Sequence, residues 1–526
     1  MFFRAFRFVF SSPSIRTALR SSPFLALVST HPHSTIADRL HDLQPPEAAK
    51  VYATLLKYPP TPYFDSLYPP FDMPAPYQQP PGRPNNLTPE QEIKLKELWI
   101  QIMKVFGVSA PPDVVQTSVL TSTVSIKSSN GVPVSSTAST LSSTATKEEP
   151  KKKKRFGILH RKDKDKENKK EDPEPALNRT ASSLSSPTIE PTETIEDKYG
   201  QSKQYLTAMS EMTPEEMRIA FWSMVKADHP DGLLLRFLRA RKWDVERALV
   251  MVISTMHWRL KDFDVEKIVF KGEGAALAEH DEGFMKQIRL GKSYLNERDK
   301  VGRPICVVRA RLHKQGDQSE DALNRYTIYT IETARMCLKD PVDTATVVFD
   351  LQDFSLANMD YAPVKFMIKC FEAHYPESLG VAIVYKAPWI FQGIWNIVRR
   401  WLDPVVAAKI HFARSLDDLS NFIDREKIWK ELGGPVDWEY KYLEPIPEED
   451  KLLQDTETRE MLLEQRAKLV REYEDATWNW IYSSAEESRT ARNDIAKKLR
   501  MDYINLDPYL RARTVYDRMK YINFEA

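Results

Sequence analysis

The chain has 526 residues, of which 42% are hydrophobic and 28% are charged, and its 75 basic and 74 acidic residues give a net charge of +1. This composition excludes a collagen, a disulfide scaffold and a fully disordered chain. Because the two signs of charge balance, no overall field attracts nucleic acid, and we expect no nucleic-acid partner.

Residues 1–87 divide into two compositional parts. Residues 1–37 contain four arginines and several serines but no acidic residue, which is typical of a mitochondrial transit peptide. A disordered tail and a start codon placed too far upstream are the alternatives. Residues 38–87 are rich in Pro and Tyr, a composition that favours extended geometry and cannot bury a core. We therefore expect 1–87 to be a disordered, Pro-rich N-terminus.

A short amphipathic helix follows at 88–107. Thr88-Pro89-Glu90-Gln91 has the pattern of a capping box with Pro at the first helical position. One apolar face is formed by Leu95, Leu98, Trp99, Ile102 and Phe106, and Gly107 ends the helix. A lone helix of this length is marginal in water, so this accessory helix needs a partner for its apolar face.

Residues 108–194 read as a disordered linker. Ser and Thr dominate residues 117–146, and Lys151–Arg155 is a run of five cations. The basic run is either a solvated segment, an attraction to an anionic membrane surface or a nuclear localisation signal.

Residues 195–275 predict a helical lobe, with helices at 214–226, 232–241 and 245–260. Thr213-Pro214-Glu215-Glu216 repeats the capping pattern at Thr88, and Asp244 is a candidate cap for the third helix. The pattern then alternates. Apolar runs at Pro304–Arg309, Thr344–Leu351 and Val381–Tyr385 predict strands, and 319–339 and 361–374 predict helices. Continuous apolar strands separated by helices are typical of a parallel sheet buried on both faces. Residues 446–526 predict a charged, helical C-terminal extension.

Signatures of catalysis and metal binding are missing from the sequence. Glu377-Ser378-Leu379-Gly380 precedes a strand, whereas a nucleophile elbow follows one. Gly272-Glu273-Gly274 lacks the third glycine of a dinucleotide site. The three cysteines, Cys306, Cys337 and Cys370, are widely spaced, which is typical of a reducing compartment. We expect no enzyme activity, no disulfide and no metal.

The segment 388–402 is apolar on nearly every side at its start and ends in Arg399 and Arg400. A helix of this kind is either buried all round or spends time against lipid. Packing within a core and a gate over an apolar cavity are the two interpretations. The gate residues would be Trp389, Ile390, Phe391, Ile394, Trp395, Val398 and Trp401.

Five short motifs follow one another at characteristic spacings. They are Leu235–Asp244, Tyr375-Pro376-Glu377, Ala387-Pro388, Leu402-Asp403-Pro404-Val405 with Lys409-Ile410, and Leu432-Gly433-Gly434. Each is weak alone, but in this order they resemble the CRAL-TRIO lipid-binding family, and within it the phosphatidylinositol transfer protein branch. The resemblance covers about residues 205–445.

The resemblance implies an α/β fold in which a helical N-lobe (195–275) precedes a lipid-binding domain (276–445). This domain would hold a mixed, mainly parallel β-sheet with flanking helices, enclosing an apolar lipid cavity closed by a gate helix at 388–402. It further implies a phosphoinositide headgroup site at Glu377 and Lys409, supported by Lys242. Lysine can pair with the phosphodiester while the glutamate accepts from inositol hydroxyls. Without the resemblance, a surface salt bridge is the simpler interpretation.

The chain departs from the family where dual-ligand members bind choline phosphate. Ala345 and Val347 replace Ser and Thr, Ser378 replaces Arg, and Phe371 occupies a further polar position. Each change removes hydrogen-bonding capacity. The second ligand is therefore expected to be less polar than phosphatidylcholine, such as a sterol or a hydrocarbon.

The resemblance thus predicts a phosphatidylinositol transfer protein that extracts one lipid, shields it and delivers it to another membrane. It predicts a monomer with a bound phospholipid, no other cofactor and a transient membrane surface as partner, in the cytoplasm and at membranes, with mitochondria as the alternative. The competing hypothesis is a lipid-sensing adaptor that regulates a phosphoinositide or lipid-metabolic enzyme through 88–107 or 446–526.

Overall fold

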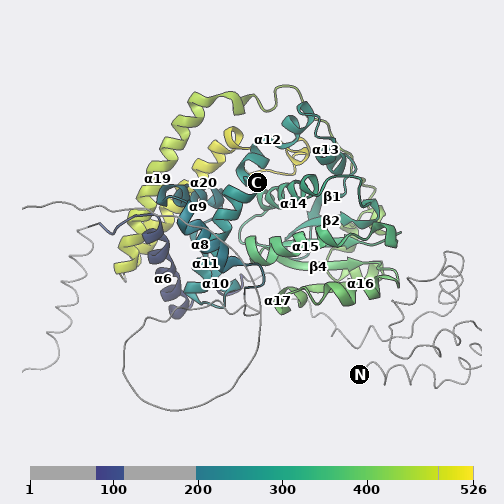
Figure 1. Ribbon diagram of the computed structural model, residues 1–526, viewed down its shortest axis with the longest axis horizontal. Coiled ribbons are helices and arrows are strands. Elements are labelled where there is room, and N and C mark those ends of the chain that lie inside the picture. The colour runs from purple at the N-terminus through teal and green to yellow at the C-terminus, as the bar shows by residue number, and fades with distance from the viewer. Residues whose placement is uncertain (1–78, 112–196, 484, 525–526) are drawn as a thin grey trace, which may run out of the picture.

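The computed structural model describes residues 79–111, 197–483 and 485–524 (Figure 1). Residues 1–78 of the expected disordered N-terminus, including the expected transit peptide, and nearly all of the expected linker, with its basic run, lie outside these ranges. Residues 79–87, expected to belong to that N-terminus, lie within them, and Arg83 contacts Asp343 at 3.0 Å. Within the described ranges, none of the helices is both long and apolar enough to cross a membrane.

The N-lobe is a bundle of helices whose starts follow the predicted caps. Thr213 and Glu216 form a capping box at the start of α9, and Asp244 caps α11. Gly272 gives α12 a kink in its middle. The helices are α8 (Gln201–Glu211), α9 (Pro214–Val225), α10 (Pro230–Ala240), α11 (Val245–His257) with a π-helical continuation (Trp258–Asp262), α12 (Val265–Ala278) and α13 (Glu282–Arg289).

The apolar face of α6 (Pro89–Val105) lies inside this lobe. Leu95, Leu98, Trp99 and Ile102 are fully buried in the same core as α9, α10 and α11. Trp99 packs edge-on against Phe221 of α9, with ring centroids 5.7 Å apart. The partner that this helix requires is therefore the chain itself.

A five-stranded sheet forms the second lobe (Figure 1). Its strands are β1 (Ser293–Arg298), β2 (Pro304–Arg309), β3 (Ala345–Asp350), β4 (Leu379–Tyr385) and β5 (Ile410–Ala413), in that spatial order. β1 pairs antiparallel with β2, and all other pairs are parallel. The predicted mixed, mainly parallel sheet is confirmed. The sequence did not indicate β1, because it is a polar edge strand, or β5, because it has only four residues.

Helices cover the sheet, and one face of the sheet also packs against residues between 419 and 440 to form a separate hydrophobic core. Tyr385, Trp429, Ile423 and Leu432 belong to that core. The helices of this lobe are α14 (Glu320–Met336), α15 (Tyr361–Lys369) with a π-helical continuation (Cys370–His374), α16 (Phe391–Val398), α17 (Pro404–Ala407) and α18 (Leu416–Ser420). Short 3-10 turns lie at Ala310–Leu312, Leu356–Asn358, Arg425–Lys427, Lys430–Leu432 and Lys451–Gln454.

The C-terminal extension packs back onto both lobes. It contains α19 (Thr456–Tyr482), α20 (Glu486–Leu510) and α21 (Val515–Arg518). Tyr473, Trp478 and Leu499 lie in the N-lobe core, and Tyr516 lies against the sheet. Its hydroxyl accepts a hydrogen bond from the backbone N–H of Leu295 at 2.9 Å, which satisfies an outward-facing donor of the edge strand β1.

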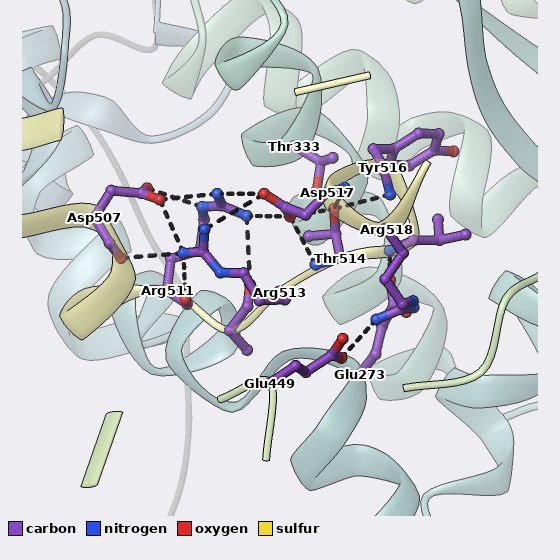
Figure 2. Close-up of polar contacts among 12 residues, drawn as sticks. Glu273, Thr333, Glu449, Asp507, Arg511, Arg513, Thr514, Tyr516, Asp517 and Arg518 are labelled. Atoms are coloured by element: carbon purple, nitrogen blue, oxygen red, sulfur yellow. Dashed lines mark hydrogen bonds and ion pairs between the residues drawn. The ribbon is translucent and has the colours of Figure 1, made fainter. Parts of the chain in front are cut away.

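The segment Gly272-Glu273-Gly274 contacts this C-terminal extension and does not form a nucleotide-binding loop. A Cβ atom on Gly272, which has a φ of +51°, would lie 2.5 Å from the Cβ of Ala512. Glu273 is fully buried and accepts hydrogen bonds from Val515 N and the Tyr329 hydroxyl, both at 2.9 Å. Figure 2 shows Arg518 lying between Glu273 and a second carboxylate, Glu449.

Candidate functional site

An apolar cavity of about 220 Å³ lies between the sheet, α14, α15 and α16. Alternating residues of adjacent strands face it, since successive side chains of a strand point to opposite sides. These strand residues are Val308, Val347, Phe349, Leu379, Ala382, Val384 and Ile410. Because the wall of the cavity is almost wholly apolar, it suits a hydrocarbon ligand.

The expected gate segment forms one side of this cavity. Phe391, Ile394, Trp395 and Val398 line it, and Trp395 packs edge-on against Phe412 of β5 with ring centroids 5.2 Å apart. The helix in the structure, α16, is shorter than the expected helix at 388–402. α16 ends at Val398, and Asp403 caps the separate helix α17 through the backbone N–H of Val405 at 2.8 Å.

Three of the expected gate residues lie away from the cavity wall. Of the residues that the structure describes, Trp389, Ile390 and Trp401 are not among those lining the cavity. Trp389 is 42% exposed, whereas Trp401 packs against the ring of Tyr361, with centroids 5.4 Å apart. Lys365 lies 4.8 Å from the Trp401 ring centroid. Trp401 therefore anchors the end of the segment on α15.

A carboxylate joins the end of this segment to the start of the N-lobe. Glu372, whose side chain is 6% exposed, accepts hydrogen bonds from the Tyr199 hydroxyl at 2.6 Å and from the backbone N–H of Asp403 at 2.7 Å. Lys198 completes the group with an ion pair to Glu372 at 2.7 Å. Burial and the hydrogen bond to Glu372 raise the pKa of Tyr199, so its hydroxyl stays protonated as a donor. We call Lys198, Tyr199, Glu372 and Asp403 the latch.

The structure brings Glu377 and Lys409 together at the N-terminal ends of β4 and β5. Lys409 Nζ lies 3.3 Å from Glu377 Oε2, and the side chains are 22% and 21% exposed. Glu377 has a φ of +53°, which is uncommon for a residue with a Cβ atom. Of the described residues, Glu377 and Lys409 are not among those lining the cavity, but Leu379 and Ile410, the first residues of the two strands, line it. The pair therefore lies just outside one end of the cavity wall.

Arg236 of α10 contacts the backbone of this pair, and Asp343 links it to two further arginines. Arg236 donates to the carbonyl of Glu377 at 2.8 Å and to the carbonyl of Asp343 at 2.5 Å. Arg239 and Arg83 each contact Asp343 Oδ2, at 3.2 and 3.0 Å. Sequence reasoning missed these residues. The basic face of the segment Leu235–Asp244 could have indicated that the arginines of α10 belong to the site. Nothing in the sequence around Arg83 indicated such a role.

Cations outnumber carboxylates in this cluster. Burial, together with the neighbouring Arg236, lowers the pKa of Arg239 to about 10, although Asp343 opposes the change. The Nε atom of Arg239 is buried without a hydrogen-bond partner among the described residues. A site with surplus positive charge and a free buried donor is suited to an anion.

Lys242 lies beside this cluster but not within the ion pair. It is exposed, has a φ of +52° and follows the end of α10, where its backbone N–H donates to Arg239 O at 3.0 Å. Among the described residues, its side chain makes no ion pair with Glu377. The structure thus brings two of the three expected headgroup residues into contact.

The four positions that depart from the dual-ligand pattern fall into two pairs. Val347 and Phe371 line the cavity, where they add apolar surface. Ala345 and Ser378 are joined through their backbones, with Ala345 N donating to Ser378 O at 2.9 Å. The Ser378 hydroxyl lies 3.5 Å from the carbonyl of Pro376 in its own turn.

A helical lobe, a mainly parallel sheet and an apolar cavity with a charged pair just outside one end define a protein that can enclose an apolar ligand. The CRAL/TRIO domain matches residues 288–434, and the CRAL/TRIO N-terminal domain matches residues 201–254. A CRAL-TRIO domain-containing protein of Schizosaccharomyces pombe is 42% identical over 440 residues, covering 83% of this chain and 91% of that protein. The phosphatidylinositol transfer protein CSR1 of Eremothecium gossypii is 39% identical over 458 residues, covering 83% of this chain and 97% of that protein. The chain belongs to the CRAL-TRIO family of lipid-binding proteins, as the sequence motifs indicated.

Proposed function

We propose that the protein is a phosphatidylinositol transfer protein. The observation that carries the proposal is the Glu377–Lys409 pair, at 3.3 Å, lying just outside one end of an apolar cavity. The relative named a phosphatidylinositol transfer protein, at 39% identity, supports the same ligand class.

The cavity addresses the main energetic obstacle to moving a lipid. A diacyl lipid has roughly 30 methylenes, and exposing them to water costs on the order of 24 kcal/mol at ~0.8 kcal/mol each. An apolar wall that replaces the bilayer removes most of this penalty. No bond is made or broken in such a transfer, so the proposed activity is not enzymatic.

The charged cluster would select the headgroup. Lys409 and Arg239 supply donors for the phosphodiester, and the Glu377 carboxylate accepts from inositol hydroxyls. A zwitterionic choline head offers Glu377 no hydroxyl donors.

The outer side of the gate segment suits contact with a membrane. Trp389, Ile397 and Val405 are 42%, 42% and 50% exposed, and Arg399 and Arg400 are also exposed. Exposed apolar side chains next to arginines favour a peripheral association with anionic lipid. We propose that a monomer docks here transiently to exchange its lipid.

Transfer of phosphatidylinositol between vesicles tests the proposal. We expect Glu377→Ala and Lys409→Ala each to lower the transfer rate about tenfold or more, because each removes a charged hydrogen bond worth ~1.5–3 kcal/mol. Lys427→Ala is the matched control, since Lys427 is exposed and its ion pair among the described residues is the local one with Asp424 at 2.8 Å. Transfer that survives both headgroup substitutions would show that the site is assigned wrongly.

The adaptor hypothesis rests on the linker at 108–194 with its basic run, on the capped helix at 88–107 and on the charged extension at 446–526. Much of the apolar surface of α6 and of the extension is buried in the chain's own N-lobe core, which removes one reason for a partner. Ile93 of α6 and Met461 and Leu463 of α19 stay exposed. Capture of a stoichiometric partner through the exposed sides of α6 or α19 would restore that hypothesis.

A further inference from the structure

A second polar cluster lies on the cavity wall, at the opposite end of the sheet from Glu377 and Lys409. One of its residues, Lys292, precedes β1 and accepts a hydrogen bond through its carbonyl from the backbone N–H of Arg309, the last residue of β2. Glu377 and Lys409 instead precede β4 and β5, which run in the same direction as β2. Strands of about six residues place the two clusters about 20 Å apart.

The cluster is a chain of three side chains that all line the cavity. Lys292 Nζ lies 3.3 Å from His313 Nδ1, and His313 Nε2 lies 3.3 Å from Asp360 Oδ2. Since an ammonium only donates, His313 must accept at Nδ1 and carry its proton on Nε2, from which it donates to Asp360. Within the part of the chain that the structure describes, the other polar contact of Lys292 Nζ is the Gln318 Oε1 atom, at 3.1 Å.

Lys292 lacks a counterion in this arrangement. It is 5% exposed, and both of its acceptors are neutral. Among the described residues no carboxylate forms an ion pair with it. The nearby Asp317 pairs with Lys286 instead, at 3.3 Å. An ammonium has three N–H donors, so one donor and the positive charge are left unmatched.

A buried ammonium without an ion pair is energetically unfavourable. Burial lowers the pKa of Lys292 to about 8, with Lys286 adding to the effect and Asp317 and Asp360 opposing it. A buried charge requires a partner of opposite sign, and the partner here has to come from the cavity side.

We propose that the Lys292–His313–Asp360 cluster binds the carboxylate of a long-chain fatty acid, whose chain occupies the apolar cavity. A carboxylate supplies the missing charge and accepts the free N–H of Lys292, while the hydrocarbon chain contacts Val308, Phe349 and Met367. Because a diacyl lipid needs the same apolar volume, the two ligands exclude one another. The inference uses only the cavity and does not require the other ligand to be phosphatidylinositol.

The test compares oleate with methyl oleate, which has the same chain without the charge, on the delipidated full-length protein. Displacement of a fluorescent lipid reports both affinities. We expect the wild type to bind oleate about tenfold more tightly than the ester, the gain typical of a charged hydrogen bond. Lys292→Met removes this preference, and Lys292→Arg retains it. Lys427→Met, on a lysine whose side chain is 48% exposed and pairs with Asp424, leaves it unchanged.

Equal binding of oleate and methyl oleate by the wild type overturns the proposal without the use of any variant. A preference for oleate that persists in Lys292→Met also overturns it. Since methionine removes an unmatched buried charge, the melting temperature of Lys292→Met should not fall. Phosphatidylinositol transfer by this variant should stay within about twofold of wild type. A wild type that transfers no phosphatidylinositol would refute the transfer function while leaving the oleate comparison decisive.

Discussion

Asp231 and Arg492 are 261 positions apart in the sequence and form a buried ion pair between α10 and α20. Trp99 of α6 donates from Nε1 to Asp231 Oδ1 at 2.7 Å. The Arg492 guanidinium lies over the rings of Trp480 and Tyr473, 4.4 and 4.6 Å from their centroids. One pair of residues thus joins α6, the N-lobe and both long helices of the extension.

Breaking this pair should destabilise the whole protein. We expect Asp231→Asn to lower the free energy of unfolding by about 3–5 kcal/mol, because it leaves a buried guanidinium uncompensated. Chemical denaturation measures the change. Asp231→Leu combined with Arg492→Met should lose less than either single substitution, and a double variant as unstable as the sum of the singles would contradict the pairing.

The same pair predicts a dependence on pH. Burial alone would raise the pKa of Asp231, but the Arg492 charge outweighs it and holds the pKa at about 2. A carboxyl whose pKa is depressed by folding stabilises the native state above its unfolded pKa of ~3.9, and this stabilisation is lost as the pH falls toward 2. The stability difference between wild type and Asp231→Asn should therefore shrink between pH 4 and pH 2. A difference that stays constant would exclude this origin.

At the scale of elements, α16 is held by contacts at its flanks. Its apolar residues contact the cavity and β5, and the turn that follows it is tied by the latch to residues Lys198 and Tyr199. An eight-residue helix has little stability of its own, so these flanking contacts set how readily the segment moves.

Weakening the latch should speed lipid release. Tyr199→Phe removes one hydrogen bond to a charged group, and we expect the dissociation rate of a fluorescent lipid to rise up to about tenfold. Stopped-flow dilution into acceptor vesicles measures this rate. Tyr361→Phe, which keeps the ring packed on Trp401, should leave the rate near wild type. A Tyr199→Phe rate equal to that of the control would show that the latch does not limit release.

At the scale of the whole molecule, the two lobes and the extension share their cores. Val470, Tyr473, Trp480 and Leu499 of the extension complete the N-lobe core. The matched family regions end at residue 434, yet the N-lobe is covered by residues beyond that point.

A chain that ends at residue 445 should therefore fail to fold. Removing 446–526 exposes the apolar surface of α6, α9 and α10 and leaves Asp231 without Arg492. Soluble yield and a cooperative thermal transition are the measurements. A truncated protein that melts within a few degrees of the full chain would show that the extension is dispensable.

Local sequence patterns fixed the elements that depend only on neighbouring residues. The capping boxes at Thr88 and Thr213 and the apolar run Pro304–Arg309 appear in the structure where the sequence predicted them. The motif containing Glu377 indicated the family together with the other short motifs, because their order and spacing can be read directly from the sequence. The assignment of the headgroup site stays a prediction.

Only the tertiary structure decided which distant residues meet. Arg83 and Asp343, 260 positions apart, converge on the cluster beside Glu377, and Lys292 meets His313 and Asp360 on the cavity wall. The same holds for the face of α6, whose partner is supplied partly by helices more than 300 residues later. Contacts of this kind depend on how helices and strands pack in space, which the periodicity of one segment does not record.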